Sequence, residues 1–242
     1  MNRVDVAIVD YGMGNLRSVE QALRHVAPSA NIVVTDDAGV IGQAGRVVFP
    51  GQGAMPDCMR ELDARGLRSA VVHAARNKPF LGICIGLQML FEHSAEGDVA
   101  GLGVLQGEVV RFASNMQDAK GAKLKVPHMG WNQVHQITYP SLQAGEKTIA
   151  LSPSEGGKLN RGLVDTYSHP LWDGIAQDAR FYYVHSYYVK PQDANLIQAT
   201  SDYPQPFVCA VAQENLFAVQ FHPEKSQAAG LKLLQNFVQW NP

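Results

Sequence analysis

The chain has 242 residues, of which 46% are hydrophobic and 17% charged, and its formal net charge is -2 at pH 7. This composition is that of a globular domain, and it offers no clustered basic face of the kind that a nucleic-acid-binding protein needs. No apolar run reaches the about 18 residues that a membrane-spanning helix requires. We therefore expect neither a nucleic-acid partner nor a membrane partner.

The cysteines and the N-terminal residues bear on cellular location and on cofactors. Cys58, Cys84 and Cys209 are an odd number without metal-ligand spacing. Residues 1–5 lead directly into a strand-like segment and lack the long apolar stretch of a signal peptide. The run 12–15, Gly-Met-Gly-Asn, lacks the third glycine of a dinucleotide-binding loop. We expect free thiols, a cytoplasmic location, no metal site and no cofactor.

In its first 110 residues, the chain alternates short β-branched runs with helical patterns. We expect strands at 4–9, 31–35, 46–49 and 78–84, and helices from about 15, over 57–76 and over 86–93. Such alternation is typical of βαβ units around a mainly parallel sheet, whose functional residues lie at the carboxyl ends of the strands.

The second half of the chain is richer in strands. We expect strands at 107–111, 181–189, 196–200, 207–213 and 216–221, and a closing helix over about 226–240. The last two strands, joined by Glu214-Asn215, have the pattern of a hairpin. The predicted fold class is α/β: a mainly parallel open sheet with helices on both faces, plus an antiparallel extension, in a single domain over residues 1–242.

One segment, at about 138–165, interrupts this pattern. It contains Pro140, Pro153 and the pair Gly156-Gly157, and it has no amphipathic period. Such a density of proline and glycine is typical of loops, and loops of this length are usually functional or disordered. We therefore expect a long surface loop inserted into the domain.

A candidate nucleophile lies in Gly82-Ile83-Cys84-Ile85-Gly86, between an apolar strand and a helix. The pattern is the thiol form of a nucleophile elbow, in which glycines allow a tight turn that presents one side chain at the edge of the sheet. The helix N-terminus offers the backbone N–H of Ile85 to an oxyanion. A buried structural cysteine would fit the same position, and α/β hydrolases share the elbow, so the motif alone does not select a family.

His222 and Glu224 supply a base and a carboxylate that could orient it. Side chains two apart on an extended segment share a face, and Pro223 favours extended backbone at His222. A thiol nucleophile needs such an oriented base. Taken alone, a solvated His-Pro-Glu turn explains these residues equally well, but together with Cys84 the catalytic interpretation predominates.

The segment Pro50–Ala54 follows the third expected strand and contains Gly51-Gln52-Gly53. Its glycines free the backbone to turn N–H groups toward an anion, although an ordinary strand-to-helix turn would have the same composition. The segment lacks the lysine of a phosphate-binding loop.

Taken together, the motifs at 50–53, 82–88 and 220–224 resemble those of the class I, triad-type glutamine amidotransferases, in the same order. Finer features are similar to one branch of that family, the glutaminase subunits of imidazole glycerol phosphate synthase. These features are residues 10–18, 127–132, 184–187 and 225–226. The resemblance covers the chain except for about 138–165, where this sequence carries an insertion that the family usually lacks. The resemblance implies a flavodoxin-like fold.

The resemblance implies a role for each motif. Cys84 would attack the carboxamide of glutamine and form a γ-glutamyl thioester. His222 would accept the thiol proton and then protonate the departing ammonia, with Glu224 orienting it. The remaining implied residues are an oxyanion hole of Gly51, Gln52, Gly53 and Ile85, and a substrate-binding set of Gln88, Ser186 and Tyr187.

The resemblance also implies a partner: a (β/α)8-barrel cyclase subunit that receives the ammonia and forms imidazole glycerol phosphate and an aminoimidazole carboxamide ribotide in histidine biosynthesis. The residues facing that partner would be Asn15, Met129, Trp131 and Asn132.

Three other functions stay open at this point. A glutaminase subunit of another synthase would have the same catalytic residues and differ only in its partner. A free-standing γ-glutamyl hydrolase would reach its full rate alone. A non-enzymatic scaffold would not need the intact Cys-His-Glu set.

Overall fold

The computed structural model describes residues 3–118, 120–140 and 166–242. Most of the segment expected as an inserted surface loop, 138–165, therefore lies outside the described residues. On either side of the undescribed residues 141–165, two short strands, β10 (Tyr139–Pro140) and β11 (Thr166–Tyr167), pair with each other, so the expected loop begins with a strand. No helix within the described ranges is long and apolar enough to cross a bilayer.

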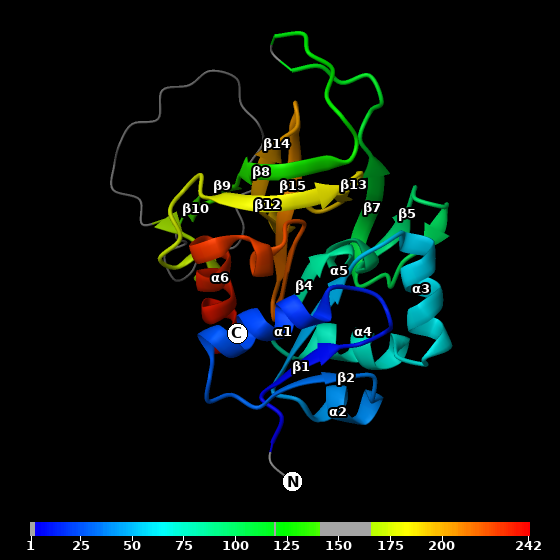
Figure 1. The fold of residues 1–242 in the computed structure, drawn as a ribbon, viewed down its shortest axis with the longest axis vertical. Helices are drawn as coiled ribbons and strands as arrows, with labels where there is room; N and C mark the ends of the chain where they lie inside the picture. Colours follow the sequence, from blue (N-terminus) through cyan, green and yellow to red (C-terminus); the bar gives the residue numbers. More distant parts are fainter. Residues whose placement is uncertain (1–2, 119, 141–165) are drawn as a thin grey trace.

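One large sheet forms the centre of the fold (Figure 1). Neighbouring strands of its parallel half are β2 (Ile32–Thr35), β1 (Val6–Val9), β3 (Arg46–Gly51), β4 (Phe80–Cys84) and β16 (Leu216–Val219), in that order. Every residue of β1, β4 and β16 is buried. Parallel strands covered on both faces have such continuous apolar runs, and their burial supplies the core.

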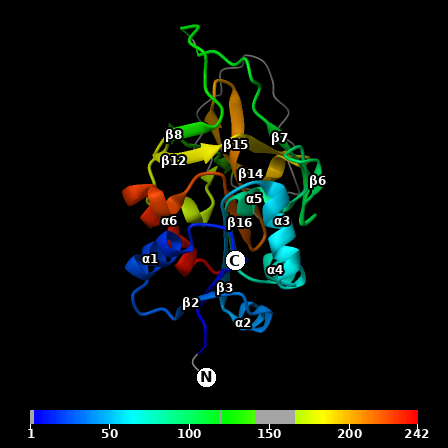
Figure 2. The ribbon, with the colours of Figure 1, turned by 45° about the vertical axis from the view of Figure 1, so that its right-hand side comes forward.

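Helices cover both faces of this parallel half, as Figure 2 shows. On one face, α1 (Leu16–Val26) packs against α6 (Gln227–Gln239). On the other face lie α2 (Ala38–Gln43), α3 (Met55–Ala64) and α4 (Arg68–Asn77). The short helix α5 (Ile85–Met89) begins directly after β4.

Beyond β16 the sheet continues into an extension. Its strands are β15 (Pro206–Gln213), β13 (Tyr187–Pro191) and β7 (Leu105–Arg111), followed by β5 (Phe91–Ser94) and β6 (Val99–Ala100). A branch leaves this path at β15, which pairs with β14 (Ile197–Asp202), and β14 in turn pairs with β9 (His135–Gln136). Apart from the parallel pair of β5 and β7, these pairs are antiparallel.

A separate antiparallel ribbon pairs β8 (His128–Gln133) with β12 (Arg180–His185) above the carboxyl edge of the parallel strands (Figure 1). Short 3-10 turns are η1 (Pro170–Trp172), η2 (Ala194–Leu196) and η3 (Pro223–Lys225). The predicted α/β class, a mainly parallel sheet with an antiparallel extension, is confirmed, and so is the hairpin of β15 and β16. The assignment of residues 1–242 to one domain stays a prediction.

Three of the expected elements were wrong in detail. The helix expected over 57–76 is two helices, because Gly66 between them has a left-handed φ of +67°. The helix expected over 86–93 ends at Met89, since the next residues pair with β7 as strand β5. The strand expected over 181–189 breaks at Ser186, where the chain leaves the ribbon and joins the main sheet. Helix α2, begun by an Asp37 cap, was not expected.

Candidate active site

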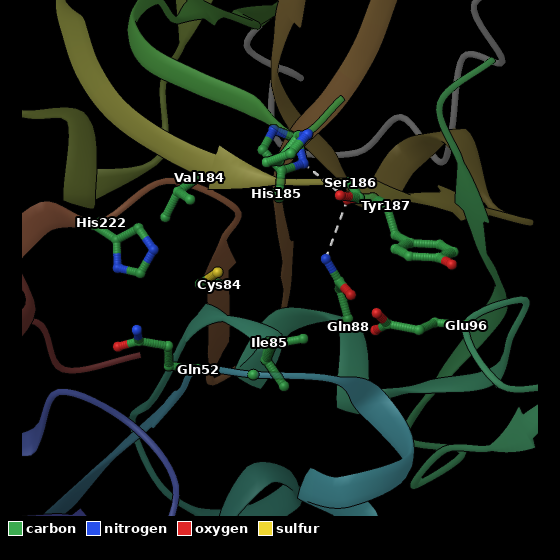
Figure 3. Close-up of a pocket in the computed structure, with 12 residues that line it drawn as sticks. Gln52, Cys84, Ile85, Gln88, Glu96, Val184, His185, Ser186, Tyr187 and His222 are labelled. Carbon is green, nitrogen blue, oxygen red and sulfur yellow. Dashed lines mark hydrogen bonds between the residues drawn. The ribbon is translucent and has the colours of Figure 1, made fainter. Parts of the chain in front are cut away.

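The carboxyl ends of three neighbouring strands bring the sequence motifs together. Gly51 at the end of β3 is paired with Cys84 at the end of β4, and β16 beside β4 leads into His222. They border a cavity of about 240 Å³ (Figure 3). Its lining residues are Gln52, Gly53, Cys84, Ile85, Gln88, Glu96, Pro127, Val184, His185, Ser186, Tyr187 and His222.

The turn at Cys84 is strained. Its φ of +56° and ψ of -110° are sparsely populated by residues with a side chain, at a cost of about 1–3 kcal/mol. The flanking glycines remove the clashes that the turn would otherwise create. A β-carbon on Gly86 would overlap the carbonyl oxygen of Phe49, and one on Gly82 would lie 3.0 Å from the β-carbon of Ala218. The spacing of the motif therefore presents the thiol at the edge of the sheet.

His222 and Glu224 form a buried pair beside the thiol. The His222 Nδ1 and Glu224 Oε1 atoms are 2.9 Å apart, and the two side chains are only 4% and 2% exposed. Since the carboxylate accepts, Nδ1 carries a proton. The other ring nitrogen, Nε2, makes no hydrogen bond to any described residue. Figure 3 shows the His222 ring facing the same cavity as the Cys84 sulfur.

The surroundings of His222 favour its charged form. Burial alone would lower the pKa of His222, but the neighbouring Cys84 sulfur and the Glu224 carboxylate outweigh burial and raise that pKa well above its ordinary value. A histidine with such a pKa holds a proton taken from a nearby thiol, so the geometry and the electrostatics both suit a thiolate nucleophile.

The backbone around His222 differs from the extended segment expected. His222 itself is extended, but Pro223–Lys225 form the 3-10 turn η3, so Glu224 reaches Nδ1 from a turn rather than by strand alternation. The turn is fixed by Ser226, whose hydroxyl donates to the His222 carbonyl at 2.6 Å and accepts from the Tyr182 N–H at 2.9 Å. The His222 N–H donates to the Tyr182 carbonyl. These bonds anchor the base to β12.

The residues predicted for the oxyanion hole lie at the floor of the cavity. Gln52, Gly53 and Ile85 line it, whereas Gly51 is buried just behind them. Gly51 has to be a glycine because a β-carbon there would overlap the Tyr11 hydroxyl, and Gly53 has a φ of +114°. The Gln52 carbonyl accepts a hydrogen bond from the Cys58 thiol at 3.7 Å.

The predicted substrate-binding residues form the opposite wall. Gln88 is buried, and its Nε2 donates to the Tyr187 carbonyl at 3.1 Å and to Gln220 Oε1 at 3.0 Å. Gln220 in turn lies with Nε2 3.7 Å from the Cys84 sulfur. Ser186 lies beside Tyr187 at the junction of β12 and β13. The structure thus brings the predicted catalytic and substrate residues together, with Cys84, His222, Gln88, Ser186 and Tyr187 lining one cavity and Glu224 buried behind His222, and their roles stay predictions.

Sequence reasoning missed two polar residues that line the cavity, Glu96 and His185. Glu96 lies near Gln88, and its Oε2 accepts the Met55 N–H at 2.8 Å (Figure 3). It follows β5, the strand that was expected to be a helix, so no signal placed it at the site. His185 belongs to the run 184–187 that carried the family resemblance, but its spacing indicated no role.

The residues predicted to face a partner do not line the cavity. Met129 and Trp131 on β8 are 62% and 42% exposed, the exposure expected of large apolar side chains at an interface. Asn132 points the other way, and its Nδ2 donates to the Asp202 carbonyl at 2.8 Å. Asn15 is half-buried and directly precedes α1. No group of three or more His, Cys, Asp or Glu side chains among the described residues is placed to hold a metal ion.

Buried histidines also occur outside the catalytic set. Burial lowers the pKa of His128 and His169 to about 4 and is the main cause that lowers the pKa of His185 to about 3. We expect the free energy of unfolding to fall as the pH falls below about 6.5, because the unfolded chain then binds protons that these rings exclude. Each ring contributes up to about 1.4 kcal/mol per pH unit. His222 adds little slope there, because its raised pKa keeps it protonated in the folded state and its ordinary pKa of about 6.5 leaves it mostly protonated in the unfolded chain.

Chemical denaturation at pH 7.5, 6 and 5 measures this dependence. Replacing buried His169 by phenylalanine should flatten the slope, whereas replacing exposed His73 by alanine should leave it unchanged. A free energy of unfolding that is constant between pH 7.5 and pH 5 would contradict the prediction.

Comparison with known proteins places this site in a family. The model of the class-I glutamine amidotransferases matches residues 7–240. The imidazole glycerol phosphate synthase subunit HisH of Thiobacillus denitrificans is 59% identical over 240 residues, 99% of this chain and 92% of that protein. HisH of Nitrosospira multiformis is 60% identical over 239 residues, 98% of this chain and 99% of that protein.

Solved structures show the same fold at low sequence identity. A glutamine amidotransferase crystal structure superposes with a TM-score of 0.63 at 14% identity, covering 97% of each chain. Another, from Thermotoga maritima, gives 0.52 at 15% identity, covering 93% of this chain and 77% of that one. Since the family match spans nearly the whole chain and the HisH proteins are so similar throughout, the chain belongs to the class-I glutamine amidotransferases and, within them, to the HisH family.

Proposed function

We propose that this chain is the glutaminase subunit of an imidazole glycerol phosphate synthase, which acts in histidine biosynthesis. The observation that carries the proposal is the strained Cys84 elbow facing the same cavity as the His222–Glu224 pair. The HisH relatives, which are subunits of imidazole glycerol phosphate synthase, support the choice of synthase. The free thiols of Cys58, Cys84 and Cys209 support a cytoplasmic location. No cofactor is part of the proposal.

The reaction begins with attack of the Cys84 sulfur on the carboxamide carbon of glutamine. The carbonyl oxygen becomes an oxyanion, which the N–H groups of Ile85 and the Gly51–Gly53 turn would stabilise. His222 donates the proton it took from the thiol to the amide nitrogen, and ammonia leaves as the γ-glutamyl thioester forms. Water then attacks the thioester and gives its proton to His222, which releases glutamate and restores the thiol.

Recognition of the amino-acid end of glutamine falls to the opposite wall. The Glu96 carboxylate is the acidic side chain near Gln88 and Tyr187, so it is placed to bind the α-ammonium group. We expect Glu96→Gln to raise the KM for glutamine about tenfold while changing kcat less, since a charged hydrogen bond contributes about 1.5–3 kcal/mol. The exposed Glu108→Gln is the matched control. An unchanged KM in Glu96→Gln would remove this assignment.

The proposed partner is a (β/α)8-barrel cyclase that receives the ammonia and forms a heterodimer with this chain. Exposed Met129 and Trp131 support a protein interface on β8. We also assign Asn15 to the partner-facing side of the molecule, whereas Asn132, predicted to face the partner, belongs to β8 with its side chain turned inward. The turn that contains Asn15 connects with the site, because Gly14 and Met13 lie against Gly51 and Gly53.

Partner binding is expected to accelerate glutamine hydrolysis by about two to three orders of magnitude. The Gln52 peptide lies between two glycines and can present either its carbonyl or its N–H to the cavity, and one oxyanion donor contributes about 2.7–4 kcal/mol. The test compares glutamate production by the isolated chain with that by its complex with the cyclase and the acceptor nucleotide. Equal rates would indicate a free-standing hydrolase, and failure to bind the cyclase would indicate another synthase.

A further inference from the structure

Behind the cavity wall, side chains that the reaction does not use form a continuous line of hydrogen bonds. His185 Nδ1 lies 2.8 Å from the Tyr187 carbonyl oxygen, and His185 Nε2 lies 3.0 Å from His128 Nδ1. His128 Nε2 is 3.3 Å from Asn132 Nδ2. The same Tyr187 oxygen accepts from Gln88 Nε2, and Figure 3 shows both bonds meeting at it. The line therefore joins the substrate cavity to strand β8.

The chemistry of these groups fixes the direction of every bond. The Tyr187 carbonyl can only accept, so His185 carries a proton on Nδ1. Both imidazoles are neutral at pH 7, since burial keeps the pKa of each far below its ordinary value. His185 Nε2 is then an acceptor, which requires the proton of His128 to be on Nδ1 and leaves His128 Nε2 to accept from Asn132. The N–H groups of Asn132, His128 and His185 thus all donate in the same direction along the line, toward the Tyr187 carbonyl. In such an arrangement each hydrogen bond polarises the next.

Aromatic packing holds the two rings in place. The His128 ring is stacked on Tyr203 at 4.1 Å and on Tyr183 at 5.0 Å between centroids, with 29° between the planes in each pair. Phe112 and Phe207 contact both histidines. Rings enclosed in this way cannot turn without disrupting the cluster, so the line of bonds has one geometry.

Strand alternation connects this line to the partner-facing surface. His128 and Asn132 are four residues apart on β8 and lie on its inner face, while Met129 and Trp131 between them are exposed on the outer face. A displacement of β8 by a bound protein would move both inner side chains with it. The first and second donors of the line thus belong to the element that a partner would contact.

We propose that Asn132, His128 and His185 are positioning residues: they orient the Tyr187 carbonyl, and with it Gln88, for binding glutamine, and they link that carbonyl to the strand that faces the partner. The inference deepens the proposed glutaminase function and rests on it for its kinetic consequence. None of the three donates or accepts a proton in the reaction.

A spectroscopic test addresses the bonds themselves and does not depend on any activity. Long-range ¹H–¹⁵N correlation spectra of the ring nitrogens, assigned with single His128→Phe and His185→Phe variants, report the tautomer of each ring. We expect both rings to be neutral at pH 7 with the proton on Nδ1. A proton on Nε2 in either ring, or a charged ring, would overturn the line of bonds whatever the enzyme does.

A kinetic test asks whether this line of hydrogen bonds contributes to glutamine binding in the complex with the cyclase. His128→Phe keeps a ring in the aromatic cluster but removes both hydrogen bonds, and we expect it to raise the KM for glutamine about three- to tenfold with kcat within about twofold. His128→Gln can donate and accept again, so it should restore KM to within about twofold of the parent. Phe207→Leu is the matched control, because it loosens the same cluster without touching the bonds.

Asn132→Leu covers the case in which His128→Phe does not fold, because residue 132 is half-buried and tolerates a side chain of similar size. It removes the first donor and should raise KM by about twofold or more, in the isolated chain as well as in the complex. An unchanged KM in a folded His128→Phe or Asn132→Leu protein overturns the inference. If the complex of the unmodified chain with the cyclase does not hydrolyse glutamine, the proposed function is overturned instead. The NMR measurement of the ring tautomers then still tests whether the line of hydrogen bonds exists.

Discussion

Cys84→Ala and Cys84→Ser should each lower glutamine hydrolysis by at least about 10⁴-fold while the fold survives. The expected loss is this large because the sulfur is the proposed nucleophile, and removing one member of a catalytic set removes almost all of the chemistry. Stability should change little, since the side chain lies at the edge of the cavity rather than in the middle of the core. Glutamate release under saturating glutamine measures the rate, and circular dichroism and cyclase binding report the fold.

Cys209→Ala is the matched control for this variant. Cys209 is also a buried free thiol, but it lies on β15 away from the cavity. Its replacement should lower the melting temperature and leave turnover per folded molecule unchanged. Comparable turnover in the parent and in Cys84→Ala would show that another group attacks the substrate.

The second large effect is expected at His222. His222→Ala removes the base and the acid together and should reduce kcat by at least about 10³-fold. Glu224→Ala should cost about a hundredfold less, because an orienting carboxylate contributes less than the group it orients. Glu224 Oε1 keeps the proton of His222 on Nδ1. Glu224→Ala should therefore leave the imidazole base present but poorly oriented.

Rates measured under saturating glutamine in the complex separate these two variants. Exposed His73→Ala serves as the control for histidine removal. If Glu224→Ala were as inactive as His222→Ala, the carboxylate would have to take part in proton transfer itself.

The residues that carry chemistry were largely predictable because they belong to short motifs at strand ends. The nucleophile elbow could be recognised from Gly82, Cys84 and Gly86, because the turn leaves no room for β-carbons at the two positions that flank the cysteine. The predicted family is confirmed by the match over 7–240 and by the HisH relatives. The roles assigned to the individual site residues stay predictions that the variants above test.

Other parts of the site could not be predicted, because tertiary contacts determine them. Glu96 reaches the cavity only because Phe91–Ser94 pair with β7, a contact between segments that local propensity does not encode. The break between β12 and β13 at Ser186 arises because the residues before it pair with β8 in the ribbon and those after it pair with β7 in the main sheet. The inward hydrogen bonds of His128 and Asn132 likewise depend on where β8 lies relative to His185 and Asp202.

The position of β16 between β4 and β15 has a consequence for how the enzyme comes into being. The strand that leads to His222 is synthesised long after the strand that ends at Cys84, yet it inserts beside that strand. A nascent chain can form β1–β4 and display a thiol, but it holds no base beside it, so a partly synthesised chain cannot release ammonia. Pairing across such a sequence separation is slow compared with helix formation. Hydrolysis therefore has to wait until β16 has joined β4 and completed the parallel half of the sheet.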